Sequence, residues 1–274
     1  MREIIVVSDL GEFGLIARIV ARLAGAAPSP DVLLGPGDDS AVLRAADGRV
    51  TITTDVLVEG VHFRRDWSTG YDVGRRAAAA NLADVAAMGA SPTGLVVGLA
   101  APGDLPLTWA DGLADGFRDE CSLVGAVVVG GDVVSSPTLM VSVTALGDLR
   151  GHPPVTRSGA QPGDAVVVAG RVGFAAAGLA LLRAGRHDHD LADAHRRPVV
   201  AYAAALRLGE LGATSMIDVS DGLVADLGHV ARASGVRIEL ALDDLPLPAE
   251  LVDAALEVGI DPLSWVANGG DDHA

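Results

Sequence analysis

Hydrophobic and polar positions along this chain follow two periods, that of a helix and that of a strand. Residues 12–23 place apolar side chains at helical spacing and predict an amphipathic helix. Residues 49–55 alternate β-branched and polar side chains and predict a strand, which we expect to form a hairpin with the strand ending at Leu43, across the turn at 46–48. The same patterns predict helices over 72–88, 108–123, 173–182 and 201–211, strands over 95–101, 126–130, 139–147 and 165–169, and a short strand running into a helix over 215–223. This mixture predicts an α/β (α+β) fold.

The ends of these elements suggest caps and a domain boundary. We expect Asp72 to cap the helix over 72–88 and Gly89 to close it, and either Ser220 or Asp221 to cap the helix after residue 222. Residues 151–154, Gly-His-Pro-Pro, interrupt the pattern and predict two domains, 1–150 and 151–274. The chain has 274 residues, which is enough for two cores. Its last residues, 268–274, stop within a further Gly/Asp turn, so we expect the second domain to be incomplete.

Composition excludes several functions. A formal charge of -16 and a pI near 4.6 argue against a nucleic-acid partner. No apolar run approaches the roughly 18 residues that span a bilayer, and the start does not read as a secretory signal, so we expect a cytoplasmic protein without a membrane partner. Cys121 is the only cysteine, which excludes an internal disulfide. All 20 basic residues are arginine, which excludes a P-loop or Schiff-base lysine.

Carboxylates and hydroxyls gather at strand ends, beside glycines and on one helix face. The strand over 50–55 stops on Thr53, Thr54 and Asp55, whose oxygens suit a hard cation. Asp84 shares an apolar helix face with Asn81, where a carboxylate is costly unless paired or metal-bound. Further carboxylates follow glycines or a short strand at Asp39, Asp132, Asp218 and Asp221. Together they suggest a shared metal cluster, although a surface turn at residues 37–40 or a helix cap at 220–221 would explain single members.

Taken in order, these motifs make the chain similar to the PurM-like family of ATP-dependent small-molecule kinases and synthetases, and within it to the branch that phosphorylates thiamine monophosphate. The similarity runs from about Gly11 to the C-terminus. It rests on Gly-Asp-Asp at 37–39, Thr-Thr-Asp at 53–55, Glu-Gly-Val-His-Phe at 59–63, the stretch 81–90, Gly-Gly-Asp at 130–132, Arg-Ser-Gly-Ala at 157–160, the stretch 218–227 and Gly-Gly-Asp-Asp at 269–272. Each motif alone is weak, whereas the ordered set is specific. The family usually has Glu at position 271, where this chain has an Asp that is one methylene shorter.

The resemblance implies roles for the matched residues. The family's Mg²⁺ ligands fall on Asp39, Thr53, Thr54, Asp55, Asp84, Asp132, Asp218 and Asp221. Its nucleotide contacts fall on Gly131, Asp132, Arg157 and Ser220, and its substrate contacts fall on His62 and Asp271. Among the metal ligands, we expect Asp55, Asp84 and Asp221 to matter most for catalysis.

The implied reaction moves the γ-phosphoryl group of ATP to the phosphate of thiamine monophosphate with the help of several Mg²⁺ ions. The implied architecture is a homodimer, in which the strands of residues 1–150 form a β-barrel with a second subunit, and residues 151–274 form an incomplete α/β domain. Alternatives are another PurM-like synthetase, of the aminoimidazole-ribonucleotide or hydrogenase-maturation type, a metal-dependent phosphohydrolase, and a nucleotide-binding protein without activity. His62 and the stretch 81–90 favour the thiamine branch.

Overall fold

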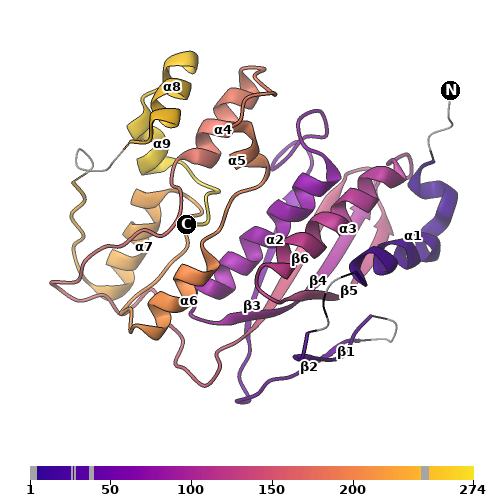
Figure 1. Cartoon of the computed structure of the whole chain (residues 1–274), viewed down its shortest axis with the longest axis horizontal. Helices are drawn as coiled ribbons and strands as arrows, with labels where there is room; N and C mark the ends of the chain where they lie inside the picture. The colour runs from indigo at the N-terminus through magenta and orange to yellow at the C-terminus, as the bar shows by residue number, and fades with distance from the viewer. Residues whose placement is uncertain (1–4, 26, 28, 37–39, 242–246) are drawn as a thin grey trace. The chain divides into compact units, whose positions relative to one another are not determined.

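The structure is a computed structural model that describes residues 5–25, 27, 29–36, 40–241 and 247–274. The chain forms two compact units (Figure 1). Unit 1 comprises Met1–Val85 and Ala90–Gly151, and unit 2 comprises Ala86–Gly89 and His152–Ala274. Among the described residues, no helix has both the length and the apolar character needed to cross a membrane.

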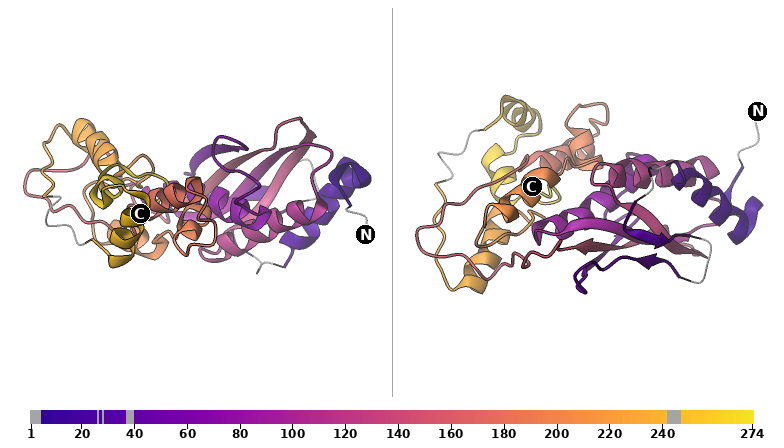
Figure 2. Two further views of the ribbon diagram at one scale, coloured as in Figure 1. Left: turned by 90° about the horizontal axis from the view of Figure 1, so that it is seen from above. Right: turned by 60° about the horizontal axis from the view of Figure 1, so that its bottom comes forward.

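Unit 1 is built on a four-stranded sheet in the order β3-β6-β4-β5. Helices α2 and α3 cover one face of this sheet, and α1 packs against α3 (Figures 1 and 2). The elements are α1 (Val7–Leu23), β1 (Val32–Leu34), β2 (Val42–Leu43), β3 (Thr51–Val58), α2 (Gly70–Ala87), β4 (Ser91–Ala101), α3 (Leu107–Ser122), β5 (Val127–Ser135) and β6 (Met140–Asp148). Strands β4 and β5 are parallel and joined through α3, whereas β6 is antiparallel to both β3 and β4.

The two faces of the sheet differ in burial. On the inner face, which α2 and α3 cover, Leu57, Leu99 and Val141 are buried. Because neighbouring residues of a strand point to opposite faces, the residues between them form an outer face. There the exposed apolar side chains are Ile52, Val56, Val96, Val134 and Met140. The sheet therefore has one packed face and one outer face with exposed apolar side chains, which Leu43 of β2 approaches only near Gly94 in the described residues.

Glycines allow α2 and α3 to approach each other closely. A Cβ atom on Gly74 would lie 2.2 Å from the carbonyl oxygen of Leu113, and one on Gly116 would lie 2.3 Å from that of Tyr71. Such distances are far below any real contact of a Cβ atom, so a larger residue would push the helices apart. This close crossing holds α2, which carries Asp84, against α3.

Unit 2 consists of helices joined by irregular segments in its described residues. Its elements are α4 (Phe174–Arg183), α5 (Ala192–Arg196), α6 (Tyr202–Glu210), α7 (Leu223–Ser234), α8 (Ala249–Val258) and α9 (Pro262–Asn268). Phe174, Leu181, Leu251 and Trp265 form the centre of its core. These side chains come from α4, α8 and α9, so the core ties the C-terminal helices to the helix that begins the unit.

The predicted helices and the strands of unit 1 are confirmed, with ends shifted by a few residues, but the predicted hairpin is wrong. Strand β3 pairs with β6 over its whole length, from Thr51 opposite Gly147 to Val58 opposite Met140. Strand β2 pairs instead with β1. A strand of eight residues gains far more backbone hydrogen bonds from β6 than a two-residue strand can supply, so long-range pairing overrides the local turn.

Two further strand predictions are wrong. Residues 165–169 and 215–219 have no regular strand structure. In the first segment, Val167 keeps 65% of its surface exposed, and Val166 and Val168 are exposed as well. A run of valines favours an extended backbone, but an extended segment becomes a strand only where a neighbour supplies hydrogen bonds.

The predicted closure of α2 by Gly89 is confirmed, since Gly89 follows the helix with φ of 69°, but the predicted N-terminal caps differ from the structure. Thr69 precedes α2, and Asp72 folds back to accept hydrogen bonds from the Thr69 N–H at 2.8 Å and its hydroxyl at 2.7 Å. Asp72 is thus the second half of a capping box rather than the first cap. At α7 neither Ser220 nor Asp221 caps the helix. Gly222 holds that position instead, with φ of 116°.

Candidate functional site

In unit 1, the clearest contact between predicted site residues joins a strand to a helix. The hydroxyl of Thr53 on β3 donates to Oδ2 of Asp84 on α2, at 2.6 Å. Asp55 lies two residues further along β3, hence on the same inner face. All three are at least partly exposed to solvent. Oxygen donors from two different elements therefore share one accessible edge of the unit, which is a suitable donor set for a hard cation.

Thr54 and Asp132 lie elsewhere in unit 1. Thr54 points to the outer face, where its hydroxyl donates to the carbonyl of Val143 at 2.8 Å and accepts from Thr144 at 3.1 Å. Asp132 belongs to β5, at the opposite edge of the sheet from β3. Across the sheet, Asp132 lies opposite Gly98 of β4, Gly98 lies opposite Ser142 of β6, and Ser142 lies opposite Val56 of β3. Val56 is on the outer face, so Asp132 is on the outer face as well.

The spacing of the sheet separates these residues further. Three inter-strand steps of about 4.8 Å put the backbones of β3 and β5 roughly 14 Å apart. Within one chain, the structure therefore does not bring Asp132 to Thr53 and Asp84. The glycine before Asp132 has a packing role of its own, because a Cβ on Gly131 would lie 2.0 Å from the carbonyl oxygen of Val97.

His62 lies in the turn that follows β3, and its ring is exposed. Its Nδ1 accepts the N–H of Val58 at 3.0 Å, and its carbonyl accepts from the guanidinium of Arg76 at 2.9 Å. Acceptance at Nδ1 places the proton of the neutral ring on Nε2. The turn thus holds the imidazole with an N–H donor facing away from its own backbone.

In unit 2, two loops that carry predicted site residues are bonded to each other. The N–H of Asp271 donates to the carbonyl of Ser220, and the N–H of His273 donates to that of Val219, both at 2.9 Å. Nδ1 of His273 lies 3.2 Å from Oδ2 of Asp218, and both side chains are buried. The loops 218–222 and 269–273 consequently form one structural element despite their separation in sequence.

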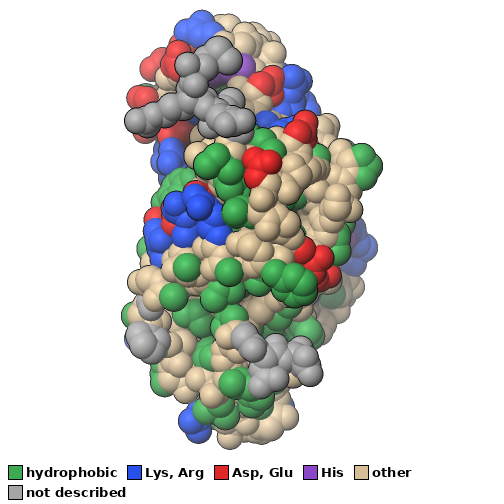
Figure 3. Space-filling model, turned by 90° about the vertical axis from the view of Figure 1, so that its right-hand side faces the viewer, with side chains coloured by type: hydrophobic (Ala, Val, Ile, Leu, Met, Phe, Trp, Pro, Cys, Tyr) green, Lys and Arg blue, Asp and Glu red, His purple; other side chains and the backbone are tan. Residues whose placement is uncertain are grey.

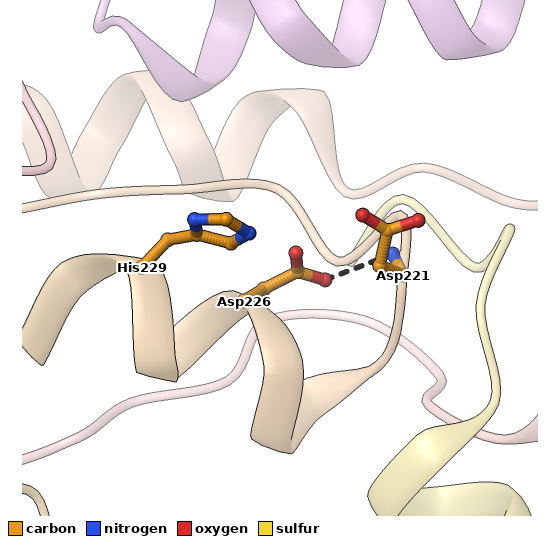
Figure 4. A group of neighbouring side chains, drawn as sticks. All are labelled: Asp221, Asp226 and His229. Atoms are coloured by element: carbon orange, nitrogen blue, oxygen red, sulfur yellow. Dashed lines mark hydrogen bonds between the residues drawn. The ribbon is translucent and has the colours of Figure 1, made fainter. Parts of the chain in front are cut away.

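A buried carboxylate outside the predicted set of site residues holds the first of these loops. Oδ2 of Asp226, on the first turn of α7, accepts the N–H groups of Ser220 and Asp221 at 3.0 Å and of Gly222 at 3.1 Å. Figure 4 shows the Asp226 carboxylate directed at the backbone of Asp221, with His229 beside it. Burial raises the pKa of Asp226, although the N–H groups oppose the effect. The sequence signal for this contact was the position of Asp226, four residues after Gly222 of the loop.

Asp272 anchors the second loop. Its two carboxylate oxygens accept the N–H of Gly173 at 2.5 Å and of Ala175 at 2.7 Å, at the start of α4. The side chain is only 4% exposed, and this burial raises the pKa of Asp272 to about 6. Asp271 beside it has φ of 64°, a left-handed conformation that residues other than glycine seldom adopt.

Arg157 begins a turn whose backbone is fixed by Ser234. The Ser234 hydroxyl donates to the carbonyl of Arg157 at 2.9 Å and accepts the N–H groups of Gly159 and Ala160 at 3.1 Å. The side chain of Arg157 is exposed. An exposed guanidinium on a fixed turn can make a bidentate contact with a phosphate.

The predicted residues therefore form two local groups. The structure joins Thr53 to Asp84 in unit 1, and it joins the loops of Asp218, Ser220, Asp221 and Asp271 in unit 2. Asp39 lies outside the described residues, so its predicted metal role stays a prediction. The alternation of side chains along a strand could have shown that Thr54 faces away from Thr53 and Asp55. The distance of Asp132 from them could not be predicted in this way, because it depends on the order of the strands in the sheet.

Comparisons with known proteins match nearly the whole chain. The model of the AIR synthase related protein, N-terminal domain, matches residues 37–149, and that of the C-terminal domain matches residues 161–263. A thiamine-monophosphate kinase of Mycobacterium tuberculosis is 49% identical over 268 residues, which are 97% of this chain and 80% of the relative.

Solved structures agree with these sequence matches. The crystal structure of thiamine-monophosphate kinase from Stenotrophomonas maltophilia K279a matches with a TM-score of 0.80 and 34% identity, over 94% of this chain and 83% of the other. A structure described as AaThiL complexed with AMPPCP and TMP matches with a TM-score of 0.76 and 33% identity, over 100% and 85%.

Proposed function

The chain belongs to the thiamine-monophosphate kinase family, with the two AIR synthase related domains, and we propose that it transfers the γ-phosphoryl group of ATP to thiamine monophosphate on a Mg²⁺-dependent site. It is an enzyme, a thiamine-phosphate kinase that uses ATP as co-substrate. The observation that carries this conclusion is the 49% identity to a thiamine-monophosphate kinase over 97% of the chain. The complex with AMPPCP and TMP supports both substrates. The alternative synthetase, hydrolase and non-enzymatic readings are not favoured.

The side chains present fit Mg²⁺ by their chemistry. In unit 1, Asp55, Asp84 and the hydroxyl of Thr53 offer hard oxygen donors on one face, and the short contact between the last two aligns them before any ion arrives. In unit 2, Asp221 offers an exposed carboxylate on a fixed loop, and Asp218 precedes it on the same loop as a buried carboxylate 3.2 Å from Nδ1 of His273. We propose these five residues as Mg²⁺ ligands, three of them in unit 1 and two in unit 2. Bound there, Mg²⁺ would neutralise the repulsion between the nucleotide phosphates and the acceptor phosphate.

Two other residues that the sequence predicts as Mg²⁺ ligands, Thr54 and Asp132, lie apart from Thr53 and Asp84 in unit 1. Thr54 uses its hydroxyl in the sheet, and Asp132 lies on the far edge strand. We keep Asp132 and Gly131 as nucleotide-side residues because the Gly-Gly-Asp motif exposes both of them at the edge of the sheet. Asp39 retains its assignment from the family motif alone.

The reaction needs no general base. The second pKa of a phosphate monoester is about 6, so the acceptor oxygen is already ionised at neutral pH. That oxygen forms a bond to the γ-phosphorus, while the bond from phosphorus to the oxygen bridging to the β-phosphate breaks and ADP leaves with the electron pair. The task of the protein is therefore to position two polyanions and to balance their charge.

The side chains outside the metal set act as positioning contacts. The Nε2–H of His62 can donate to an oxygen of the substrate phosphate, because Val58 holds the ring by its other nitrogen. Arg157 presents a charged fork to the nucleotide phosphates in a chain that has no lysine for this purpose. Ser220 and Asp271 lie on the paired loops, which sets the positions of their side chains relative to each other.

We propose further that two copies of the chain associate through the outer face of the sheet. The sheet is open, with β3 and β5 as its edges in the described residues, and a closed barrel needs about eight strands. Ile52, at 69% exposure, and Val56 and Val134 leave an apolar surface that a second copy would cover. Figure 3 faces the right-hand side of Figure 1 and shows hydrophobic side chains gathered in the lower part of that view, with few charged ones among them. We also propose a domain boundary near residue 151 and a cytoplasmic location for the protein.

The proposed reaction is tested by ADP release, measured with a coupled assay in four mixtures that contain or lack thiamine monophosphate and contain or lack Mg²⁺. We expect ADP only where both are present. Equal ADP release without thiamine monophosphate would support a phosphohydrolase instead. ADP release that continues after chelation of divalent cations would contradict the metal assignment while leaving the kinase reaction intact.

A further inference from the structure

The hydrogen bonds of Asp226 exceed what a helix cap requires. One carboxylate oxygen accepts the N–H groups of three consecutive residues, Ser220, Asp221 and Gly222. A usual N-cap satisfies one or two such donors from a residue before the helix, whereas Asp226 lies within the first turn and reaches back to the loop. Because these three N–H groups share one acceptor atom, the backbone conformation of all three loop residues is fixed relative to α7.

The surroundings make this arrangement rigid. Asp226 is only 2% exposed, so water cannot replace the carboxylate as an acceptor. Gly222 has φ of 116°, and a Cβ there would lie 2.7 Å from the carbonyl carbon of Asn268. A bulkier residue cannot enter, and without the carboxylate three buried or half-buried N–H groups would lose their partner.

The same geometry argues against a ligand role for the bonded oxygen. Asp221, Asp226 and His229 each have a potential ligand atom within 4.8 Å of the others (Figure 4). Oδ2 of Asp226, however, already receives three N–H donors, which occupy the directions in which a cation would bind. Its position suits it to orient the neighbouring carboxylate.

We propose that Asp226 is a positioning residue for the kinase reaction, which holds the loop 220–222 so that Ser220 faces the nucleotide and Asp221 faces its metal ion. This inference rests on the proposed roles of Ser220 and Asp221. The carboxylate acts through the backbone of its neighbours and touches neither substrate. Residues that orient metal ligands in this indirect way change affinity by about 10- to 100-fold when removed.

The test is calorimetric binding of AMPPCP at one fixed Mg²⁺ concentration below saturation, which involves no turnover. We expect Asp226→Ala to raise the Kd by about 10- to 100-fold. Asp226→Asn retains one carbonyl acceptor and should give a smaller increase in the same direction. A purely structural role would lower the number of binding-competent molecules, and hence the stoichiometry, while the Kd of the folded fraction stayed at the wild-type value.

Two further variants separate the possible failures. Asp111→Asn removes a buried carboxylate that pairs with Arg18 and Arg22 in unit 1, so it should lower the melting temperature without changing the Kd. Asp221→Asn should raise the Kd directly. If Asp221→Asn weakens binding and both Asp226 variants keep the wild-type Kd, the positioning role is wrong and the proposed site stands. If Asp221→Asn and both Asp226 variants all keep the wild-type Kd, the metal role of Asp221 is wrong, and the positioning role of Asp226 fails with it.

Discussion

Asp84→Asn tests the metal assignment in unit 1 with the smallest change of structure. The amide has the shape of the carboxylate, and its carbonyl oxygen can still accept the hydroxyl of Thr53, which now lies 2.6 Å from Oδ2. Packing of α2 on the sheet is therefore retained. The substitution removes one negative charge at the place where we propose that a cation binds.

The size of the effect follows from that charge. Two unit charges 4 Å apart interact by about 4 kcal/mol at the effective dielectric of roughly 20 that applies near a protein surface. Asp84 is half-buried, and a water molecule can take the vacant ligand position, which recovers part of this energy. We expect kcat/KM to fall by about 10²- to 10³-fold, equivalent to roughly 3–4 kcal/mol, while the free energy of unfolding changes by less than about 1 kcal/mol.

The assay measures ADP release at several Mg²⁺ concentrations, together with thermal unfolding. Asp104→Asn is the matched control, since it removes the same charge from an exposed loop residue, and it should keep wild-type turnover. Turnover of Asp84→Asn within about threefold of wild type at limiting Mg²⁺, a difference below about 1 kcal/mol, would show that Asp84 does not bind the ion. A large loss of stability would show instead that Asp84 serves the fold.

Three other predictions follow from individual contacts. Because burial raises the pKa of Asp272 to about 6, its protonation stabilises the fold fully below its ordinary value near 3.8, and this contribution disappears as the pH rises through 6. Unfolding measured between pH 4 and 7 should show wild type losing up to about 3 kcal/mol relative to Asp272→Asn, and parallel curves would contradict the assignment. Gly131→Ala should lower stability markedly because its Cβ would lie 2.0 Å from the carbonyl oxygen of Val97, whereas Gly130→Ala meets no atom within 4 Å; equal melting temperatures of the two variants would refute this reading. Ile52→Glu should yield folded monomers in light scattering, and an unchanged mass, or a wild type that is already monomeric, would count against the outer face as the dimer interface.

The sequence determined local elements better than their pairing. The helical period at residues 12–23 and the apolar runs of β4 and β6 depend on neighbours a few positions apart, and each element appears in the structure. The partner of β3 is more than eighty residues away, so no local signal could identify β6. The turn at 46–48 instead suggested a hairpin that the two-residue β2 could not sustain.

The same distinction holds for the candidate site. A hydroxyl at a strand end and a carboxylate on an apolar helix face predicted that Thr53 and Asp84 belong to one site, and the two side chains are hydrogen-bonded. Thr54 was grouped with them, although the strand period of two already directs it to the other face. The bonds of Asp226 and Asp272 to backbone N–H groups could not be predicted, because they depend on how two distant loops meet.

Phosphorus NMR can show directly whether the chain transfers a phosphoryl group to the phosphate of thiamine monophosphate. The mixture contains the protein, Mg²⁺, ATP and thiamine monophosphate, and a second tube lacks the acceptor. Phosphoryl transfer to the acceptor predicts that the monophosphate resonance of the acceptor falls while the two coupled resonances of a thiamine diphosphate grow together with those of ADP, in the first tube alone. Inorganic phosphate appearing at equal rates in both tubes, with the acceptor resonance unchanged, would contradict it.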